Sequence, residues 1–188
     1  MTDTINAEIQ KSLDNFTRHF AAFISDQYSE MRNCSFFDAV PDEALARLVN
    51  VSNMITFKAG DRIITEGDAM SSFYVILFGS AAVYVKKKKV ATIIGGECMG
   101  EATFFARETQ TRSASVVADG EVILLEITKN KIDAIDEATQ KYLNKALLLA
   151  MFKKLQAANN KINELTCENE RLNHAHLIEL NMLKNEFK

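Results

Sequence analysis

The sequence predicts an α+β fold, in which an antiparallel β-roll or barrel is flanked by N-terminal helices and a long C-terminal coiled-coil helix. Three observations support this. Apolar residues of the first 50 positions recur at helical spacing, glycine-marked β-rich runs fill the middle, and the last 60 residues lack glycine and proline. We therefore expect a helical segment at 1–50, a β-roll at 51–140 and a C-terminal dimerisation helix at 141–188.

Composition excludes several classes of protein. The 188 residues are 47% hydrophobic, which is typical of a globular chain, and the net charge of −3 gives no overall attraction for nucleic acid. No apolar run reaches the roughly 20 residues of a membrane span. The start has no signal-peptide pattern, and three widely spaced cysteines indicate reduced thiols. We expect a soluble cytoplasmic protein.

The N-terminal segment is predicted to be helical. Apolar residues from Ile5 through Leu13 to Phe23 follow steps of three and four, which places them on one helix face. A second helix is expected in "PDEALARLVNVS", because Pro41 suits a first turn and the acids after it complement the helix dipole.

The middle segment is predicted to form short strands. Seven β-rich runs between Ile55 and Ile127 are separated by turn residues, which is the spacing of an antiparallel barrel or roll. The run "KKKK" at 86–89 falls between two of them. We interpret it mainly as a solvated hairpin tip that protects a sheet edge, with polyanion binding as the alternative.

The C-terminal segment is predicted to form a parallel two-stranded coiled coil, and hence a homodimer. Residues from Leu155 to Leu172 alternate steps of three and four as a and d positions do, and a stutter follows near His176. Asn169 falls on an a position, where a buried amide pair favours a parallel dimer in one register.

One motif, "MGEATFFARETQTRSASV" at 99–116, carries chemistry. A guanidinium can clamp two oxygens of a phosphate, a carboxylate can accept a ribose hydroxyl proton, and a helix that opens at Gly100 and Glu101 presents N–H groups to an anion. Arg112 and the hydroxyl of Ser113 complete the set that a cyclic 3′,5′-phosphate needs. Arg107 is a second candidate for the clamp.

Together with "FKAGDRIITEGDAMSSFYVILFGSAAVYV", this motif resembles the cyclic nucleotide-binding domain family, from about Phe36 into the last helix. The resemblance implies that Glu101 binds the ribose and Arg112 the phosphate, and it favours Arg112 over Arg107. It also implies a base-covering helix, in which Asn159 lies near the base. The implied ligand-binding residues are Gly100, Glu101, Ala102, Arg112, Ser113, Ala114 and Asn159.

Two features depart from the family pattern. The segment between Glu101 and Arg112 is slightly long and carries Glu108, whose charge would weaken phosphate binding if it pointed inward. Met99 stands where the family usually has an aromatic residue. Two structural interpretations also remain open: Glu101 and Arg112 could form a salt bridge in an unliganded roll, and Asn159 could be an ordinary solvent-facing or interface residue.

The resemblance implies a sensor rather than an enzyme. No nucleophile elbow, P-loop or dinucleotide fingerprint occurs, and we expect no cofactor and no metal. The ligand would be cyclic AMP or cyclic GMP, with cyclic AMP favoured. No helix-turn-helix follows the roll, which disfavours a transcription factor. The two leading hypotheses are a dimeric sensor that signals to an unidentified protein partner and a scaffold that has lost ligand binding.

Overall fold

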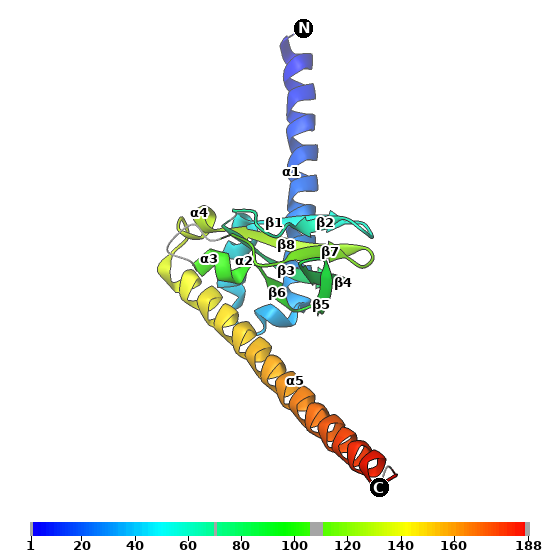
Figure 1. The fold of residues 1–188 in the computed structure, drawn as a ribbon. Coiled ribbons are helices and arrows are strands. Elements are labelled where there is room, and N and C mark those ends of the chain that lie inside the picture. Colours follow the sequence, from blue (N-terminus) through cyan, green and yellow to red (C-terminus); the bar gives the residue numbers. More distant parts are fainter. Residues whose placement is uncertain (1, 70, 106–110, 187–188) are drawn as a thin grey trace. The chain divides into compact units, whose positions relative to one another are not determined.

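The roll consists of two antiparallel four-stranded sheets in the computed structural model, which describes residues 2–69, 71–105 and 111–186 (Figure 1). The first sheet has the order β1–β8–β3–β6 and the second the order β2–β7–β4–β5. The strands are β1 (Ser52–Phe57), β2 (Arg62–Ile64), β3 (Ser72–Phe78), β4 (Ser80–Val85), β5 (Lys88–Ile94), β6 (Cys98–Met99), β7 (Ser115–Ala118) and β8 (Val122–Thr128). The predicted α+β roll is confirmed.

Alternation of side chains along the strands builds the core between the two sheets. Ile76 of β3 and Leu124 of β8 point inward from the first sheet, and Ala81 of β4 and Val116 of β7 point inward from the second. All four side chains are at most 3% exposed. This apolar filling holds the two sheets together.

Helices precede and follow the roll, and one short helix lies between β6 and β7. They are α1 (Thr2–Asn33), the 3₁₀ turn η1 (Ser35–Phe37), α2 (Asp42–Val51), α3 (Glu101–Phe105), α4 (Lys129–Ile132) and α5 (Glu137–Glu186). Pro41 precedes the first turn of α2, where Asp42 and Glu43 lie as the sequence predicts.

The packing of α1 differs along its length. Met31 is fully buried and Gln27 donates to the Ser52 hydroxyl at 2.9 Å, so the C-terminal part of α1 belongs to the core. Ile9 and Leu13 are each about half exposed, at 53% and 52%. The amphipathic pattern predicted the helix correctly, but the described residues of this chain do not cover the first part of its apolar face.

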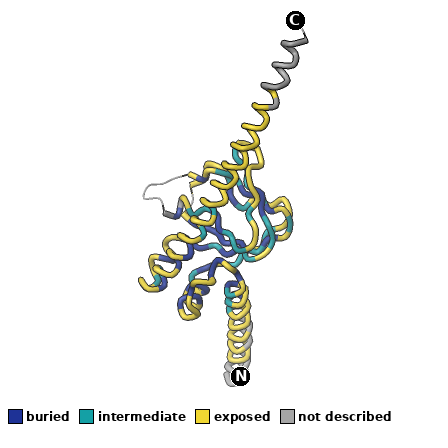
Figure 2. Tube along the Cα trace, turned by 90° about the horizontal axis from the view of Figure 1, so that it is seen from below, coloured by how far each residue is buried: buried dark blue, intermediate teal, exposed yellow. Residues whose placement is uncertain are grey.

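The chain divides into two compact units, residues 1–147 and residues 148–188, and the boundary between them lies inside α5. Leu143 and Leu147 are fully buried within the first unit, whereas Leu148 is 67% exposed. The described side chains from 155 to 174 are all exposed, as the yellow colour of this segment indicates (Figure 2). The large apolar side chains that the structure describes in the second unit are therefore exposed.

Candidate functional site

The predicted binding motif starts at the end of β6. Gly100 follows Met99 and adopts φ +81°, a left-handed conformation that residues with a Cβ atom rarely adopt. A Cβ atom at this position would press against the guanidinium of Arg112 and lie 3.1 Å from the carbonyl oxygen of Ser72. The motif therefore needs glycine here because its backbone passes directly against the arginine.

Arg112 lies just before β7 and is buried, with only 4% of its surface exposed. Its Nη1 donates to the Gly100 carbonyl at 3.0 Å, and its Nη2 donates to the Ser72 carbonyl at 2.6 Å. The guanidinium also lies near the ring of Tyr74, with Cζ 5.9 Å from the ring centroid. These contacts fix the guanidinium at the junction of β3, β6 and β7.

Burial and charge act in opposite directions on this guanidinium. Removal from water lowers the pKa of Arg112, and the nearby charges of Glu101 and Asp68, together with Tyr74, partly offset that effect. An arginine retains its proton under such conditions because its ordinary pKa is so high. The site therefore holds a positive charge in a largely desolvated position, where an anion interacts with it more strongly than in water.

A hydrogen-bond chain leads from this junction across the first sheet. The Ser72 hydroxyl donates to the Tyr74 hydroxyl at 3.2 Å, and Tyr74 donates to Glu126 at 3.2 Å. Desolvation by burial, with a contribution from Glu126, raises the pKa of Tyr74 above its ordinary value. Tyr74 therefore remains a neutral donor beside the guanidinium.

The loop between β2 and β3 fixes the backbone of Arg112. The Gly67 N–H donates to the Arg112 carbonyl at 2.8 Å, and the Arg112 N–H donates to the Asp68 carbonyl at 2.9 Å. Sequence reasoning missed Ser72, Tyr74 and Asp68. Two of them contribute backbone carbonyls, which leave no side-chain signature in a sequence.

The remaining predicted residues occupy different positions. Glu101 begins α3 and is partly buried, Ala102 and Ser113 are exposed, and Ala114 is intermediate. Asn159 is exposed on α5 in the second unit. Phe104 is buried and packs edge-to-face on Phe73, as expected for a core residue. Arg107 and Glu108 lie outside the described residues.

Among the described residues, no group of three or more His, Cys, Asp or Glu side chains is arranged to hold a metal ion. The same part of the chain contains no helix with the length and apolar character needed to cross a membrane.

A family model and the sequences of known proteins both match the part of the chain that contains the roll. Residues 54–138 match the family model described as "Cyclic nucleotide-binding domain". A cGMP-dependent protein kinase of Plasmodium berghei is 33% identical over 90 residues, which are 48% of this chain and 10% of the kinase. The chain thus spans about a tenth of that relative's length, and its match is confined to that part.

Solved structures agree on the fold. The structure titled "Sp-2Cl-cAMPS bound to PKAR CBD2" has a TM-score of 0.59 at 14% identity, covering 77% of this chain and 92% of that one. The Thermus thermophilus catabolite activator protein has a TM-score of 0.58 at 19% identity, covering 70% of this chain and 63% of that one. At these identities the likeness establishes the fold alone.

Proposed function

Because residues 54–138 form a domain of the cyclic nucleotide-binding family, we propose that this chain is a cyclic nucleotide sensor in which Arg112 binds the cyclic phosphate. The observation that carries the proposal is the buried guanidinium at the junction of three strands, oriented by two backbone carbonyls. A guanidinium held in place loses little conformational freedom when it binds an anion. Its fork shape suits two oxygens of one phosphate.

Glu101 is proposed to bind the ribose. It starts α3 directly after Gly100, and its charge acts on Arg112, so its carboxylate and the guanidinium belong to one electrostatic site. A carboxylate accepts a hydrogen bond from the ribose 2′-hydroxyl, while the arginine neutralises the phosphate beside it. Ser113 and Ala114 would line the phosphate and the edge of the base, and Asn159 would contact the base.

Cyclic AMP is the ligand we propose first. Ser113 directly after the arginine supplies a hydroxyl that is compatible with it. Cyclic GMP is the second candidate, because the same hydroxyl can accept a hydrogen bond from a guanine amino group and because matching relatives are named cGMP-dependent kinases. We propose no catalytic step, since the match to those kinases covers the binding domain and the chain carries no catalytic motif.

The output of the sensor is proposed to pass through its helices. Leu155, Ile162, Leu165 and Leu172 are between 52% and 64% exposed along α5, and soluble proteins rarely leave so long an apolar stripe uncovered. A parallel coiled-coil homodimer would cover this stripe. The nucleotide would then bias the arrangement of roll and helix, and a protein partner would read that arrangement.

Calorimetric titration of the full chain with cyclic AMP and with cyclic GMP tests the proposal. We expect saturable binding of one equivalent per chain, with a preference for cyclic AMP. A scaffold that has lost ligand binding would give no heat with either nucleotide at millimolar concentration. That result would replace the sensor by a dimerisation module, the alternative that the exposed α5 stripe also supports.

A further inference from the structure

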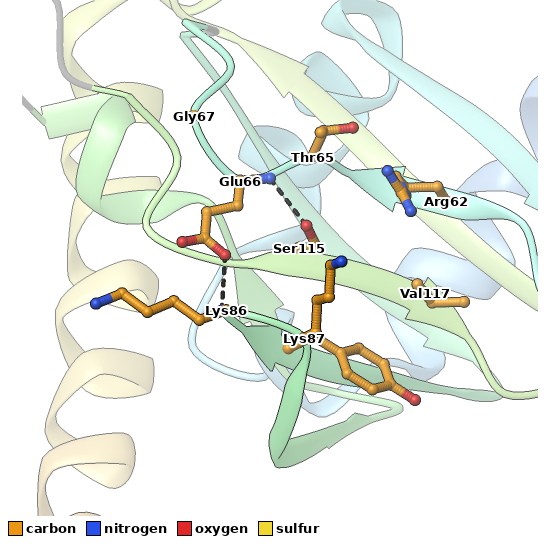
Figure 3. Close-up of a pocket in the computed structure, with 9 residues that line it drawn as sticks. Arg62, Thr65, Glu66, Gly67, Lys86, Lys87, Ser115 and Val117 are labelled. Carbon is orange, nitrogen blue, oxygen red and sulfur yellow. Dashed lines mark hydrogen bonds between the residues drawn. The ribbon is translucent and has the colours of Figure 1, made fainter.

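A cavity lies on the outer face of the sheet β2–β7–β4–β5, away from the core between the sheets. Val116 and Ala118 of β7 point into that core, so the alternating residues Ser115 and Val117 face outward. The cavity has a volume of about 790 Å³, within the range of small-molecule sites. Its lining consists of Arg62, Thr65, Glu66, Gly67, Tyr84, Lys86, Lys87, Ser115 and Val117 (Figure 3).

Three of these lining residues are cations and one is an acid. The positive charges of Arg62, Lys86 and Lys87 exceed the single negative charge of Glu66, so the lining has a net charge of two positive. The side chain of Tyr84 and the apolar side chain of Val117 supply surfaces against which a flat organic ring can pack. Hydroxyls of Thr65 and Ser115 add hydrogen-bonding groups. The lining therefore combines groups for an anion with groups for an organic body.

Two of the cations are held in an unfavourable backbone conformation. Lys86 and Lys87 form the two-residue turn between β4 and β5 and have φ of +48° and +68°. Such turns ordinarily use Asn and Gly, because residues with larger side chains resist left-handed angles. The Glu66 carboxylate accepts a hydrogen bond from the Lys86 N–H at 3.0 Å and so holds the turn against the β2–β3 loop. The turn thus contains two lysines with strained backbone angles, at positions where glycine would lower the backbone strain.

From these observations we propose that the outer cavity binds a small organic phosphate monoester of nucleotide size. A monoester carries close to two negative charges at neutral pH, which matches the net charge of the lining. A cyclic phosphate diester carries only one. Arg62 and the two turn lysines would bind the phosphate, and Tyr84 and Val117 would contact the organic part.

The outer cavity and the Arg112 site are built on the same two segments, the β2–β3 loop and residues 112–115, but different side chains face the two sites. The Glu66 N–H donates to the Ser115 hydroxyl at 3.0 Å, and the neighbouring Gly67 N–H donates to the Arg112 carbonyl. The guanidinium of Arg112 faces the interior junction, whereas Ser115 faces the outer cavity. A monoester in the outer cavity and a cyclic nucleotide at Arg112 would therefore bind at the same time.

Calorimetric titration of the full chain with 5′-AMP and with inorganic phosphate tests the proposal. We expect 5′-AMP to bind more tightly than phosphate, in the presence and in the absence of saturating cyclic AMP, and to bind equally well to Arg112→Ala. No binding of 5′-AMP at millimolar concentration would overturn the proposal. So would its loss in folded Arg112→Ala or its displacement by cyclic AMP, because either would place 5′-AMP at the interior site.

The double variant Lys86→Asn/Lys87→Gly locates the binding site. It removes both ammonium groups and installs the preferred turn residues, so we expect a higher melting temperature together with at least about tenfold weaker 5′-AMP binding. The matched control Lys88→Gln/Lys89→Gln removes the same charge from neighbouring residues that do not line the cavity. Equal losses in both double variants would show a nonspecific basic surface and would contradict the assignment, as would binding of a polyglutamate peptide that displaces 5′-AMP.

The experiments distinguish a failure of the outer-cavity proposal from a failure of the sensor proposal. The cyclic nucleotide titration depends on Arg112, and the 5′-AMP titration depends on the β4–β5 turn. Either can succeed while the other fails.

Discussion

Among the described residues, Arg32 and Arg112 each donate to a pair of backbone carbonyls, and their surroundings differ. Arg32 of α1 donates at 2.8 and 2.6 Å to carbonyls of the segment 37–40 that precedes α2. Arg112 makes the same kind of contact inside the roll, where it is only 4% exposed and a left-handed glycine brings the backbone close, whereas Arg32 also pairs with Asp42 at 3.1 Å. Carbonyl contacts and a nearby carboxylate therefore indicate structure by themselves, and the burial of the guanidinium beside a left-handed glycine marks Arg112 as a candidate ligand group.

At the same scale, the sequence supports Arg112, Gly100 and Glu101 because their side chains, or the absence of one, fit a phosphate-binding motif. It could not indicate the carbonyls of Ser72 and Asp68, since every residue has a carbonyl and only the folded backbone selects these two. Nor could spacing alone show that Ser113 is exposed in this structure while Arg112 is buried.

Replacement of Gly100 by alanine tests the close approach at Arg112. We expect Gly100→Ala to lower the free energy of unfolding by about 1–3 kcal/mol because of its left-handed φ, and also to weaken cyclic nucleotide binding by displacing the guanidinium. Gly60→Ala is the matched control, because Gly60 has a similar φ of +85° but open space around its Cβ position. Chemical denaturation and nucleotide titration of both variants provide the measurements. Equal affinities in the two variants would contradict the role given to Gly100.

A deoxy ligand tests the role of Glu101. We expect 2′-deoxy cyclic AMP to bind more weakly than cyclic AMP to the parent chain, and Glu101→Ala to bind the two ligands equally. Both changes remove one contact, so their effects on the binding free energy are not additive. Calorimetry of the four combinations measures the coupling. If the parent chain did not distinguish the ribo from the deoxy ligand, the carboxylate would not bind the ribose.

At the scale of elements, the start of α5 is fixed by a carboxylate. Asp136 accepts hydrogen bonds from the Thr139 N–H at 3.0 Å, the Thr139 hydroxyl at 2.7 Å and Arg47 of α2 at 2.8 Å. These bonds favour the ionised form and lower the pKa of Asp136 from 3.8 to about 2. The carboxylate thus caps the N-terminus of α5 and ties it to α2.

This capping contact predicts a pH dependence. A lowered folded-state pKa stabilises the fold fully above pH 3.8, and the stabilisation is lost as the pH falls from 3.8 through about 2. We expect Asp136→Asn to be less stable than the parent at pH 7, with a difference in melting temperature that narrows toward pH 3. Thermal unfolding followed by circular dichroism at both pH values provides the measurement. A difference that stayed constant or widened on acidification would show that the ionised carboxylate is not responsible.

Strands and helices were predictable from the sequence because their signals are local. The seven β-rich runs and the glycine- and proline-free C-terminal segment correspond to strands and to α4 and α5. The first two lysines of the run form a hairpin tip and the other two begin β5, but spacing could not show that the tip lysines adopt left-handed angles. That result depends on the pairing of Val85 with Lys88, which only the assembled sheet determines.

At the scale of the whole molecule, the exposed α5 stripe predicts self-association. We expect light scattering at micromolar concentration to give the mass of a dimer, and a cysteine at position 172 to cross-link to its counterpart in the second chain. Asn169→Ile should stabilise the assembly while loosening its register or raising its order, because an apolar residue removes the buried amide pair. A monomeric mass, with or without nucleotide, would contradict the dimer, and failure to cross-link would contradict the parallel alignment.

The central claim, that Arg112 binds the cyclic phosphate, is tested most directly by cyclic AMP titrations of Arg112→Ala and Arg32→Ala. Both variants remove a guanidinium that donates to two backbone carbonyls, so both are expected to lose stability and are compared at a temperature where each is folded. Loss of a desolvated charge contact costs roughly 2–5 kcal/mol of binding. We therefore predict that Arg112→Ala binds cyclic AMP about 30-fold to several thousand-fold more weakly than the parent, whereas Arg32→Ala retains the parent affinity. Parent-like affinity in folded Arg112→Ala would contradict the account.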